Sequence, residues 1–467
     1  MPIPFTTLLR DSRALATLAV PLALTQLAQV ALTTTDTVMM GLMGAEALAG
    51  GGLALVIFNQ LRTMGVGMVT AVGNQVSAAS ARADEDDELT DEAREEVRDI
   101  VRAALALATL SGIVGAIVIL LIGQAVAFLG QDPEVVDTAW PVLLALAPGL
   151  IPCLWFQAIR QFTVGMRRPQ ALLQITIASV AVNAALNWGL IHGTWVLPEL
   201  GLPGIGVSTS LVYTLTCVAL YVSARRDPRL APLLDVRIWK ARPALLRRLN
   251  GLGLPIAATY GSEAGFFSVV ALIIGTFGSA ALAAHTAVNQ LIYIVFQIAV
   301  GLSHAASLNV SRELALDRIA AARRIKNTAL ACAAAVMAVV GIVYLTVPSL
   351  VLRPFLDPST HEGSNATDIA TNLLLVAAVL QFFDCAQNIG VGLLRGLDDT
   401  KSGFRITLIG YWLIGLPAAW LLGSLADLQT TGVWLGLLTG LAATAVLLLR
   451  RYNQGLSHPP AEKAAVA

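Results

Sequence analysis

The stretch LPIAATYGSEAGFFSVVALIIGTFGSAALAAH, residues 254–285, contains one charged side chain, Glu263. A charge in the middle of a lipid-spanning segment costs ~2.5–3.5 kcal/mol on insertion scales, so such residues usually face a polar cavity and carry function. The stretch also has an earlier counterpart, because residues 21–50 match residues 255–284 at eight positions without a gap. The matched pairs include Pro21 with Pro255, Gly41 with Gly275 and Gly44 with Gly278. We infer that the chain contains two copies of one structural unit.

The composition is that of a membrane protein. Hydrophobic residues make up 56% of the 467 residues, charged residues make up 13%, and the mean hydropathy is +0.73. A soluble globule could not bury so much apolar surface. The pattern predicts an all-α integral membrane protein with twelve transmembrane helices, near residues 13–38, 51–80, 100–125, 134–158, 169–193, 203–224, 249–275, 282–310, 327–350, 367–394, 406–425 and 430–449.

The placement of positive charge predicts the orientation in the membrane. Of the 30 Lys and Arg residues, 28 fall in segments on one side, while Arg353 lies opposite and Arg62 lies inside a span. Because basic loops stay cytoplasmic, we expect a multi-pass protein of the cell (inner) membrane with both termini cytoplasmic. The first span is too long for a signal peptide and no A-x-A site follows it, so we expect no removable leader. The formal net charge of zero gives no indication of nucleic-acid binding.

Three polar segments lie outside the spans. The loop from residue 81 to 102 is both acidic and basic, and we interpret it as a solvated helix with i,i+4 ion pairs. A regulatory or partner contact is the alternative, and the role of residues 84–96 stays open. Residues 225–248 carry eight Lys and Arg, and we expect this linker to lie along the anionic inner leaflet. We interpret residues 453–467 as a disordered cytoplasmic tail.

The two halves are expected to have the same orientation. Each half contains six spans, an even number, so a pseudo-two-fold axis along the membrane normal should relate the halves. The predicted lobes are residues 1–224 and 249–452, joined by the linker 225–248. The four cysteines, at positions 153, 217, 332 and 385, all fall within spans, and we expect no disulfide.

The ionisable residues that we place well inside spans are the candidates for chemistry. We assign cation binding and coupling to Asp36, Glu263 and Asp384. Such buried acids suit H+ exchange, and two converging carboxylates also make a plausible Na+ site, with Glu263 and Asp384 as its metal ligands. The structural alternative is a satisfied hydrogen bond for each acid or, for Asp36, simple neutralisation by Arg62. We assign a substrate or polar cavity to Gln26, Asn183, Asn187, Tyr260, Phe267, Tyr293 and Phe383, although aromatic residues in spans are mostly ordinary packing.

Missing motifs narrow the class. The chain has no G-x-x-x-x-G-K-[ST] phosphate loop, so ATP is not expected to drive it directly. It also has no H-E-x-x-H, C-x-x-C or G-x-S-x-G sequence. We therefore expect no enzyme activity and no cofactor beyond a coupling ion, Na+ or H+.

Several motifs resemble the multidrug and toxic compound extrusion (MATE) transporters, most closely the NorM-type branch. They are P-x-x-x-x-Q…D-T-V-M-M-G from Pro21 to Gly41, V-N-x-x-x-N at Asn183 and Asn187, LPIAATYGSEAGFFSVVAL around Glu263, ALAAHTAVNQ from Ala281, and FFDCAQNIGVGLLRGLDDTK around Asp384. The likeness covers nearly the whole chain.

The resemblance implies a fold, an activity and a site. The fold would be two pseudo-symmetric six-helix lobes that form a V-shaped cleft. The activity would be alternating-access export of small cationic, amphipathic compounds in exchange for Na+ or H+. Glu263 and Asp384 match the cation site of the second lobe, and Asp36, Asn183 and Asn187 match the polar site of the first. This chain has Leu380 where the NorM-type pattern has a cation-contacting aromatic residue.

Other functions compete with a drug antiporter. A lipid-linked saccharide flippase of the same wider superfamily would be expected to have a more cationic cleft. Here the spans contain three acidic residues and only one Arg. A membrane-embedded transferase would need a catalytic or metal cluster, and a scaffold would leave the buried acids unexplained. The expected partners are small organic cations and membrane lipids, with no nucleic acid, and we expect a monomer.

Overall fold

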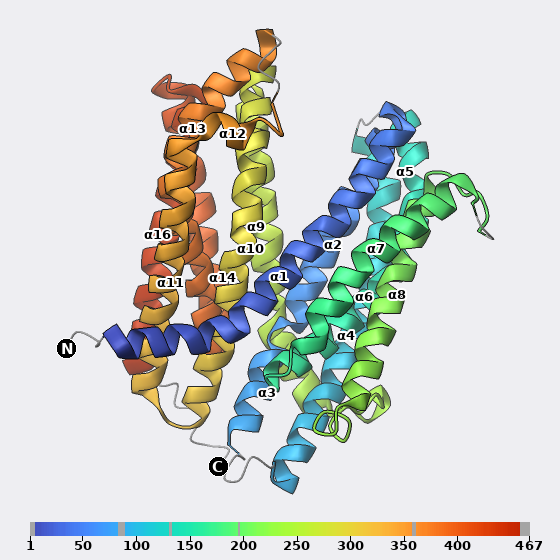
Figure 1. Ribbon diagram of the computed structural model, residues 1–467, viewed down its shortest axis with the longest axis vertical. Coiled ribbons are helices and arrows are strands. Elements are labelled where there is room, and N and C mark those ends of the chain that lie inside the picture. Colours follow the sequence, from blue (N-terminus) through green and yellow to red (C-terminus); the bar gives the residue numbers. More distant parts are fainter. Residues whose placement is uncertain (1–4, 83–88, 130–132, 195–196, 357–360, 458–467) are drawn as a thin grey trace. The chain divides into compact units, whose positions relative to one another are not determined.

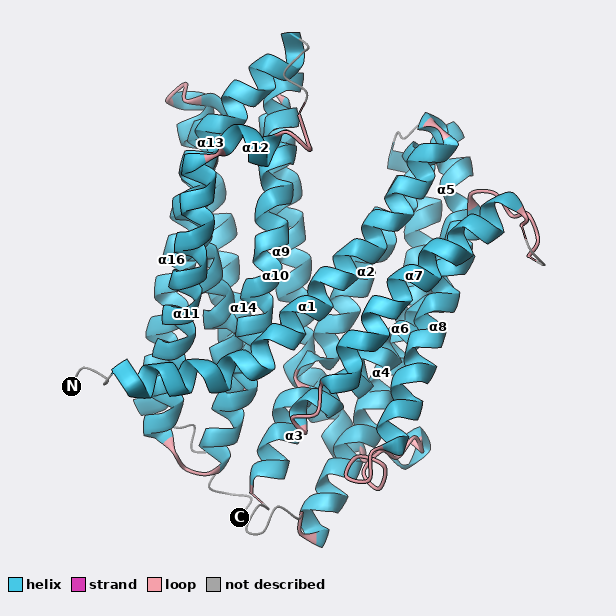
Figure 2. Cartoon of the chain, viewed as in Figure 1, coloured by secondary structure: helices cyan, strands magenta, loops and turns pink. Residues whose placement is uncertain are grey.

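The computed structural model describes residues 5–82, 89–129, 133–194, 197–356 and 361–457, and every regular element in them is a helix (Figures 1 and 2). Twelve helical segments in these ranges are long and apolar enough to cross a membrane. The predicted all-α fold with twelve spans is therefore confirmed. Several helices extend beyond the apolar spans predicted for them, because their polar ends continue the same helix past the hydrocarbon core.

The first six spans are built from eight α-helices. These are α1 (Phe5–Met43), α2 (Ala45–Thr70), α3 (Val72–Ala81), α4 (Asp91–Ala125), α5 (Pro133–Leu146), α6 (Leu150–Gly165), α7 (Gln170–His192) and α8 (Pro203–Arg226). A short 3₁₀ turn, η1 (Val126–Leu129), follows α4. A second, η2 (Ala147–Gly149), joins α5 to α6. Pro148 and Gly149 interrupt the fourth span, because proline lacks the N–H that an α-helix interior needs.

The second six spans begin after a 3₁₀ turn, η3 (Ile238–Lys240). The helices are α9 (Pro243–Gly275), α10 (Ser279–Ala315), α11 (Ile319–Thr346), α12 (Pro348–Leu352), α13 (His361–Gly396), α14 (Thr400–Leu408), α15 (Leu416–Trp420) and α16 (Gln429–Ser457). Two π-helical segments, η4 (Ile409–Gly415) and η5 (Leu421–Leu425), interrupt the eleventh span. Helix α16 continues through Ser457, so the prediction of disorder from residue 453 was wrong for residues 453–457. Residues 458–467 of that tail lie outside the described residues.

The chain divides into two compact units. The N-unit is Leu24–Tyr260, and the C-unit is Met1–Ala23 together with Gly261–Ala467. This division falls inside α1 and α9, whereas the lobe boundaries inferred from the sequence fall in the linker 225–248. Those boundaries stay a prediction.

The same helix start occurs once in each unit. Gly44 and Gly278 have φ angles of 119° and 110° and immediately precede α2 and α10. Their N–H groups donate to the carbonyls of Gly41 and Gly275, each at 3.3 Å. These φ values strain any residue with a Cβ, which explains the glycine at both matched positions.

A close helix contact also recurs in both units. A Cβ on Gly165 would lie 2.8 Å from the Gly73 carbonyl oxygen and 2.9 Å from Val76 Cβ. A Cβ on Gly396 would lie 2.9 Å from the Ser307 carbonyl oxygen and 2.8 Å from Val310 Cβ. Because Gly73 and Val76 both lie 234 positions before Ser307 and Val310, the spacing that relates residues 21–50 to 255–284 continues to this contact.

The charged loop before α4 is only partly the solvated helix that we expected. Thr90 caps α4, with its hydroxyl accepting a hydrogen bond from the Ala93 N–H at 3.4 Å. Three ion pairs on this helix are spaced i,i+3, so the i,i+4 prediction was wrong for them: Arg94–Asp91, Arg98–Glu95 and Arg102–Asp99. Asp99 and Arg102 are buried, because the linker covers them. Residues 83–88 of the loop lie outside the described residues.

Candidate functional site

Asp36 of α1 lies at the centre of a polar cluster in the N-unit. Asn187 Nδ2 donates to Asp36 Oδ1 at 2.8 Å, and Thr209 Oγ1 donates to Asp36 Oδ2 at 3.0 Å. Asn187 Nδ2 also contacts Asn183 Oδ1 at 3.2 Å, one turn away on α7. Asp36, Asn183, Asn187 and Thr209 are each at most 2% exposed. The structure therefore brings together the three predicted residues and adds Thr209 from α8.

Arg62 of α2 belongs to the same unit. Its Nε donates to Asn59 Oδ1 at 3.2 Å, three residues earlier on the helix. Its guanidinium also lies within hydrogen-bonding reach of the buried Cys153 thiol on α6. The partners described for the Asp36 carboxylate are neutral amide and hydroxyl groups, and the coupling of Asp36 to Arg62 stays a prediction.

Glu263 and Asp384 form the core of a second cluster, in the C-unit. Glu263 comes from α9 and Asp384 from α13, and the two lie close enough for their charges to interact. Tyr411 of the π-helix η4 donates from its hydroxyl to Glu263 Oε1 at 3.3 Å. Asp384 is 6% exposed, and within the described part of the chain no Lys or Arg acts on either carboxylate. Two acids from helices that are far apart in the sequence thus act on each other through their charges, and no basic partner is described for either.

Two consecutive residues of η4, Tyr411 and Trp412, form hydrogen bonds with two consecutive residues of α9, Glu263 and Ser262. Trp412 Nε1 donates to Ser262 Oγ at 2.8 Å, beside the contact of Tyr411 with Glu263. The Phe266 ring stacks on Tyr411, with centroids 4.9 Å apart and planes inclined by 14°. A π-helical segment shifts side chains relative to a regular α-helix and is frequent at functional sites. Here it places two polar aromatic groups against α9.

The residues assigned to a cavity are placed differently from one another. Phe267 and Phe383 pack against the buried core that contains Phe266 and Tyr411. Tyr293 is 47% exposed. In the N-unit, Gln26 is partly buried with no described hydrogen-bond partner for its Oε1, and the Tyr260 hydroxyl interacts electrostatically with the buried Arg160. Their role in substrate binding stays a prediction.

A metal site of the usual transition-metal kind does not occur in the described residues. No group of three or more His, Cys, Asp and Glu in those ranges could hold a metal ion. Na+ is a hard ion that takes oxygen ligands, as Mg²⁺ and Ca²⁺ do, and carboxylates are suitable donors. The role of Glu263 and Asp384 as Na+ ligands stays a prediction. All four cysteines are free.

Sequence reasoning missed three polar side chains of these clusters. Thr209 stands in a Ser-Thr-Ser run, and nothing in the run shows which hydroxyl faces Asp36. Tyr411 and Trp412 stand in an apolar span where aromatic residues usually indicate packing. The glycines and proline of GYWLIGLP, residues 410–417, were the available signal of an irregular helix there.

Comparison with known proteins shows the family. The MatE family pattern matches residues 21–189 and again residues 255–421. The probable multidrug resistance protein NorM of Pseudomonas aeruginosa is 35% identical over 437 residues, covering 93% of this chain and 88% of that protein. The multidrug resistance protein NorM of Burkholderia vietnamiensis is 33% identical over 444 residues, which cover 94% of this chain and 93% of that protein.

A solved structure shows the same fold at lower identity. It is the outward-facing conformation of a multidrug resistance MATE family transporter of the MOP superfamily, with a TM-score of 0.84 and 15% sequence identity. The similarity covers 98% of this chain and 99% of that one. The twofold family match follows the duplication seen in the sequence and in the paired glycines, and this multi-pass membrane protein belongs to the MatE family.

Proposed function

We propose that this protein is a multidrug efflux antiporter that exports cationic, amphipathic compounds in exchange for Na+ or H+. The observation that carries the coupling is the convergence of Glu263 and Asp384 inside two spans of the C-unit. Two neighbouring carboxylates without a basic partner repel each other in a medium of low dielectric constant. A bound proton or Na+ relieves that repulsion, so the pair is suited to take up and release a coupling cation.

The substrate class follows from the relatives and from charge. The NorM relatives are named as multidrug resistance proteins, and the intramembrane acids of this chain would attract a cation rather than an anion. The orientation, with both termini cytoplasmic and the protein in the inner membrane, is part of the proposal and rests on the 28 basic residues on one side.

The test is transport by the purified protein in proteoliposomes. Efflux of a fluorescent organic cation is followed under an imposed Na+ gradient and, separately, under a pH gradient. Wild-type export should respond to one of the two gradients, and Glu263→Gln and Asp384→Asn should each abolish that response. Asp368→Asn is the matched control, because Asp368 is exposed on the same helix as Asp384.

Folding is checked separately, so that loss of export in a variant can be distinguished from loss of the folded protein. Thermal stability in detergent should be close to wild type for both acid variants, because each removes a charge that has no basic partner. Gradient-driven export by both variants at the wild-type rate would refute the site. Export that ignores both ions, together with movement of a lipid-linked saccharide, would favour the flippase instead.

A further inference from the structure

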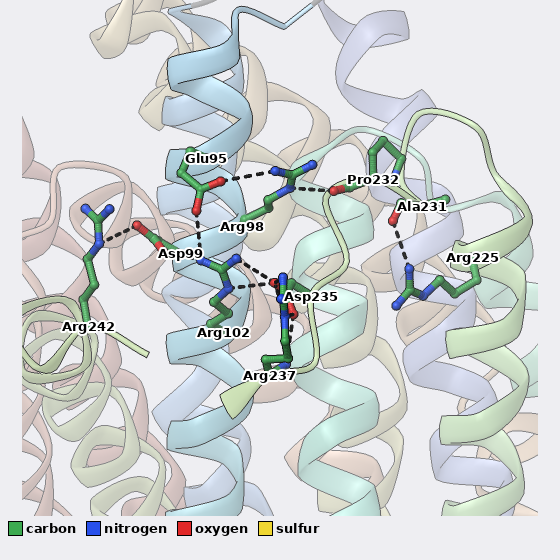
Figure 3. A network of polar contacts seen from close by, with 10 residues as sticks. All are labelled: Glu95, Arg98, Asp99, Arg102, Arg225, Ala231, Pro232, Asp235, Arg237 and Arg242. Carbon is green, nitrogen blue, oxygen red and sulfur yellow. Dashed lines mark hydrogen bonds and ion pairs between the residues drawn. The ribbon is translucent and has the colours of Figure 1, made fainter. Parts of the chain in front are cut away.

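Residues 227–242, which join α8 to α9, are fastened to the charged end of α4 (Figure 3). Arg102 Nε and Nη2 donate to Asp235 Oδ2 at 2.8 and 2.6 Å. Arg242 Nε lies 2.8 Å from Asp99 Oδ2. The side chains of Arg102, Asp235 and Asp99 are at most 10% exposed, so the Arg102–Asp235 and Arg102–Asp99 pairs are largely buried, whereas Arg242 is 68% exposed. The linker is thus attached to α4 on both sides of η3.

The first half of the linker is attached as well. Arg98 Nε donates to the Pro232 carbonyl at 2.7 Å, and Arg168 Nη1 lies 2.7 Å from Asp227 Oδ2. Leu233 and Leu234 are each 1% exposed. The linker is therefore a folded part of the N-unit, and its three-residue turn η3 has a fixed place beside α4.

The α4 sequence gives the depth of this turn in the membrane. Arg102 is the last charged residue of α4, because residues 103–125 contain none. At a rise of ~1.5 Å per residue that stretch is ~34 Å long, which matches a hydrocarbon core ~30 Å thick. We therefore expect Asp99 and Arg102 at the hydrocarbon boundary and η3, attached beside them, in the headgroup layer.

The side chains of η3 suit that layer. Trp239 is 76% exposed, and because it lies outside all twelve candidate spans, this exposure is not explained by a place on a lipid-facing span. Lys240 beside it is also exposed. Tryptophan favours the membrane interface, and lysine near the surface attracts anionic lipid. Between residues 225 and 248 the linker has eight cations and two acids, and both acids are paired with arginine. Hydrogen bonds from Arg237, and then from Arg102, hold the pKa of Asp235 below its usual range against the opposing effect of burial, so this acid stays ionised and engaged.

We propose that Trp239 and Lys240 form an anchor for anionic phospholipid headgroups of the adjoining leaflet. The indole inserts at the hydrocarbon boundary and the ammonium group binds the lipid phosphate. The ion pairs of Asp235 and Arg242 with α4 hold the turn at the required depth. This anchor is independent of the coupling ion and of the exported compound.

The experiment measures contact between Trp239 and lipid directly. The full-length protein is reconstituted into vesicles of phosphatidylcholine and phosphatidylglycerol in which either lipid, at equal mole fraction, carries brominated acyl chains that quench tryptophan fluorescence. The difference between wild type and Trp239→Phe isolates the signal of Trp239. That signal should be quenched more strongly when the anionic lipid is brominated. Trp188→Phe is the control, because Trp188 is 46% exposed on the apolar helix α7 and should show no preference between the two lipids.

Charge variants test the headgroup contact. Lys240→Gln should lower the preference of Trp239 for the anionic lipid about fivefold, the factor that corresponds to ~1 kcal/mol for one lysine near the surface. Raising the salt concentration should lower the wild-type preference too. A Trp239 signal that neither lipid quenches would overturn the anchor, since the side chain would then face water or a protein. Equal quenching by both lipids would overturn the anionic selectivity.

Discussion

Thr209 Oγ1 donates a 3.0 Å hydrogen bond to Asp36 Oδ2, joining α8 to α1 inside the N-unit. With Asn187 on the other oxygen, this gives Asp36 one donor on each side of its carboxylate. Hydrogen bonds to charged groups contribute ~1.5–3 kcal/mol each, so Thr209 should be needed to hold Asp36 in place.

Thr209→Val tests this contact, because valine keeps the shape of threonine and removes the donor. We expect a loss of ~1–3 kcal/mol in stability, measured by unfolding of the purified protein in detergent, together with slower export. Thr216→Val is the matched control on the same helix. Thr216 is also buried, but its hydroxyl bonds to the Val212 carbonyl of its own helix at 2.6 Å. Equal losses of stability and export in the two variants would show that the hydrogen bond to Asp36 contributes no more than a hydroxyl bonded within its own helix.

The partner of Asp36 that the sequence suggested, Arg62, can be tested by a double-mutant cycle. If the two charges are coupled, Asp36→Asn and Arg62→Gln should be less destabilising together than the sum of the single changes. The coupling expected for a buried pair is ~1–3 kcal/mol. Strict additivity of the two unfolding free energies would exclude the pair and leave the amide and hydroxyl groups as the partners of Asp36.

Tyr411→Phe removes the hydroxyl that contacts Glu263. That hydroxyl occupies a carboxylate oxygen that a coupling cation also needs, so its loss should favour the ion-bound state. We expect the ion concentration for half-maximal export to fall about fivefold, the factor for a hydrogen bond of ~1 kcal/mol. Tyr452→Phe is the control, because Tyr452 lies in the same unit and donates to the Ala322 carbonyl at 2.9 Å, away from the acids. An unchanged ion dependence in Tyr411→Phe would remove Tyr411 from the site.

The paired glycine contacts predict equal effects in the two units. Gly165→Ala and Gly396→Ala would each place a Cβ under 3.0 Å from a valine and a backbone carbonyl, and such overpacking costs ~1–3 kcal/mol. Gly52→Ala is the control, because a Cβ there meets no heavy atom within 4 Å. It should be neutral or stabilising by up to ~1 kcal/mol, since alanine is the better helix former. Thermal unfolding in detergent separates the three variants, and an effect at one glycine without the other would argue against equivalent packing.

The sequence predicted the features that a lipid environment makes conspicuous. Glu263 and Asp384 stand out because charge is rare in spans, and the twelve spans stand out because lipid requires long apolar helices. The convergence of the two acids could not be derived from their positions, 121 residues apart, without the family resemblance. Tyr411 was not recognised because its position depends on a π-helix, which hydrophobic periodicity does not show.

Long-range contacts outside the spans were the hardest to predict. Arg102 and Asp235 are 133 positions apart, and each stands among other charges that look solvated in the sequence. Their burial follows from the way the linker folds back on α4. Charge composition marked both segments as polar and outside the hydrocarbon core, but it did not show that they meet.

The ion pair between Arg102 and Asp235 gives a final prediction, the response of stability to acid. The pKa of Asp235 is lowered chiefly by hydrogen bonds from Arg237 and, in addition, from Arg102, while burial acts in the opposite direction. A carboxylate with a depressed pKa in the folded state stabilises the protein fully above the pKa of the unfolded chain, ~3.9, and this stabilisation is lost as the pH falls towards the folded value. Asp235→Asn should therefore cost stability at pH 7 and reduce the loss on acidification below about pH 4. We expect ~1–3 kcal/mol at pH 7, less than the ~3–5 kcal/mol of a fully unpaired buried charge, because Glu95 and Asp99 still neutralise Arg102. Unfolding in detergent across this pH range is the measurement, with the exposed Asp137→Asn as control. Parallel pH curves for wild type and Asp235→Asn would show that the linker is held by its buried leucines and not by this ion pair.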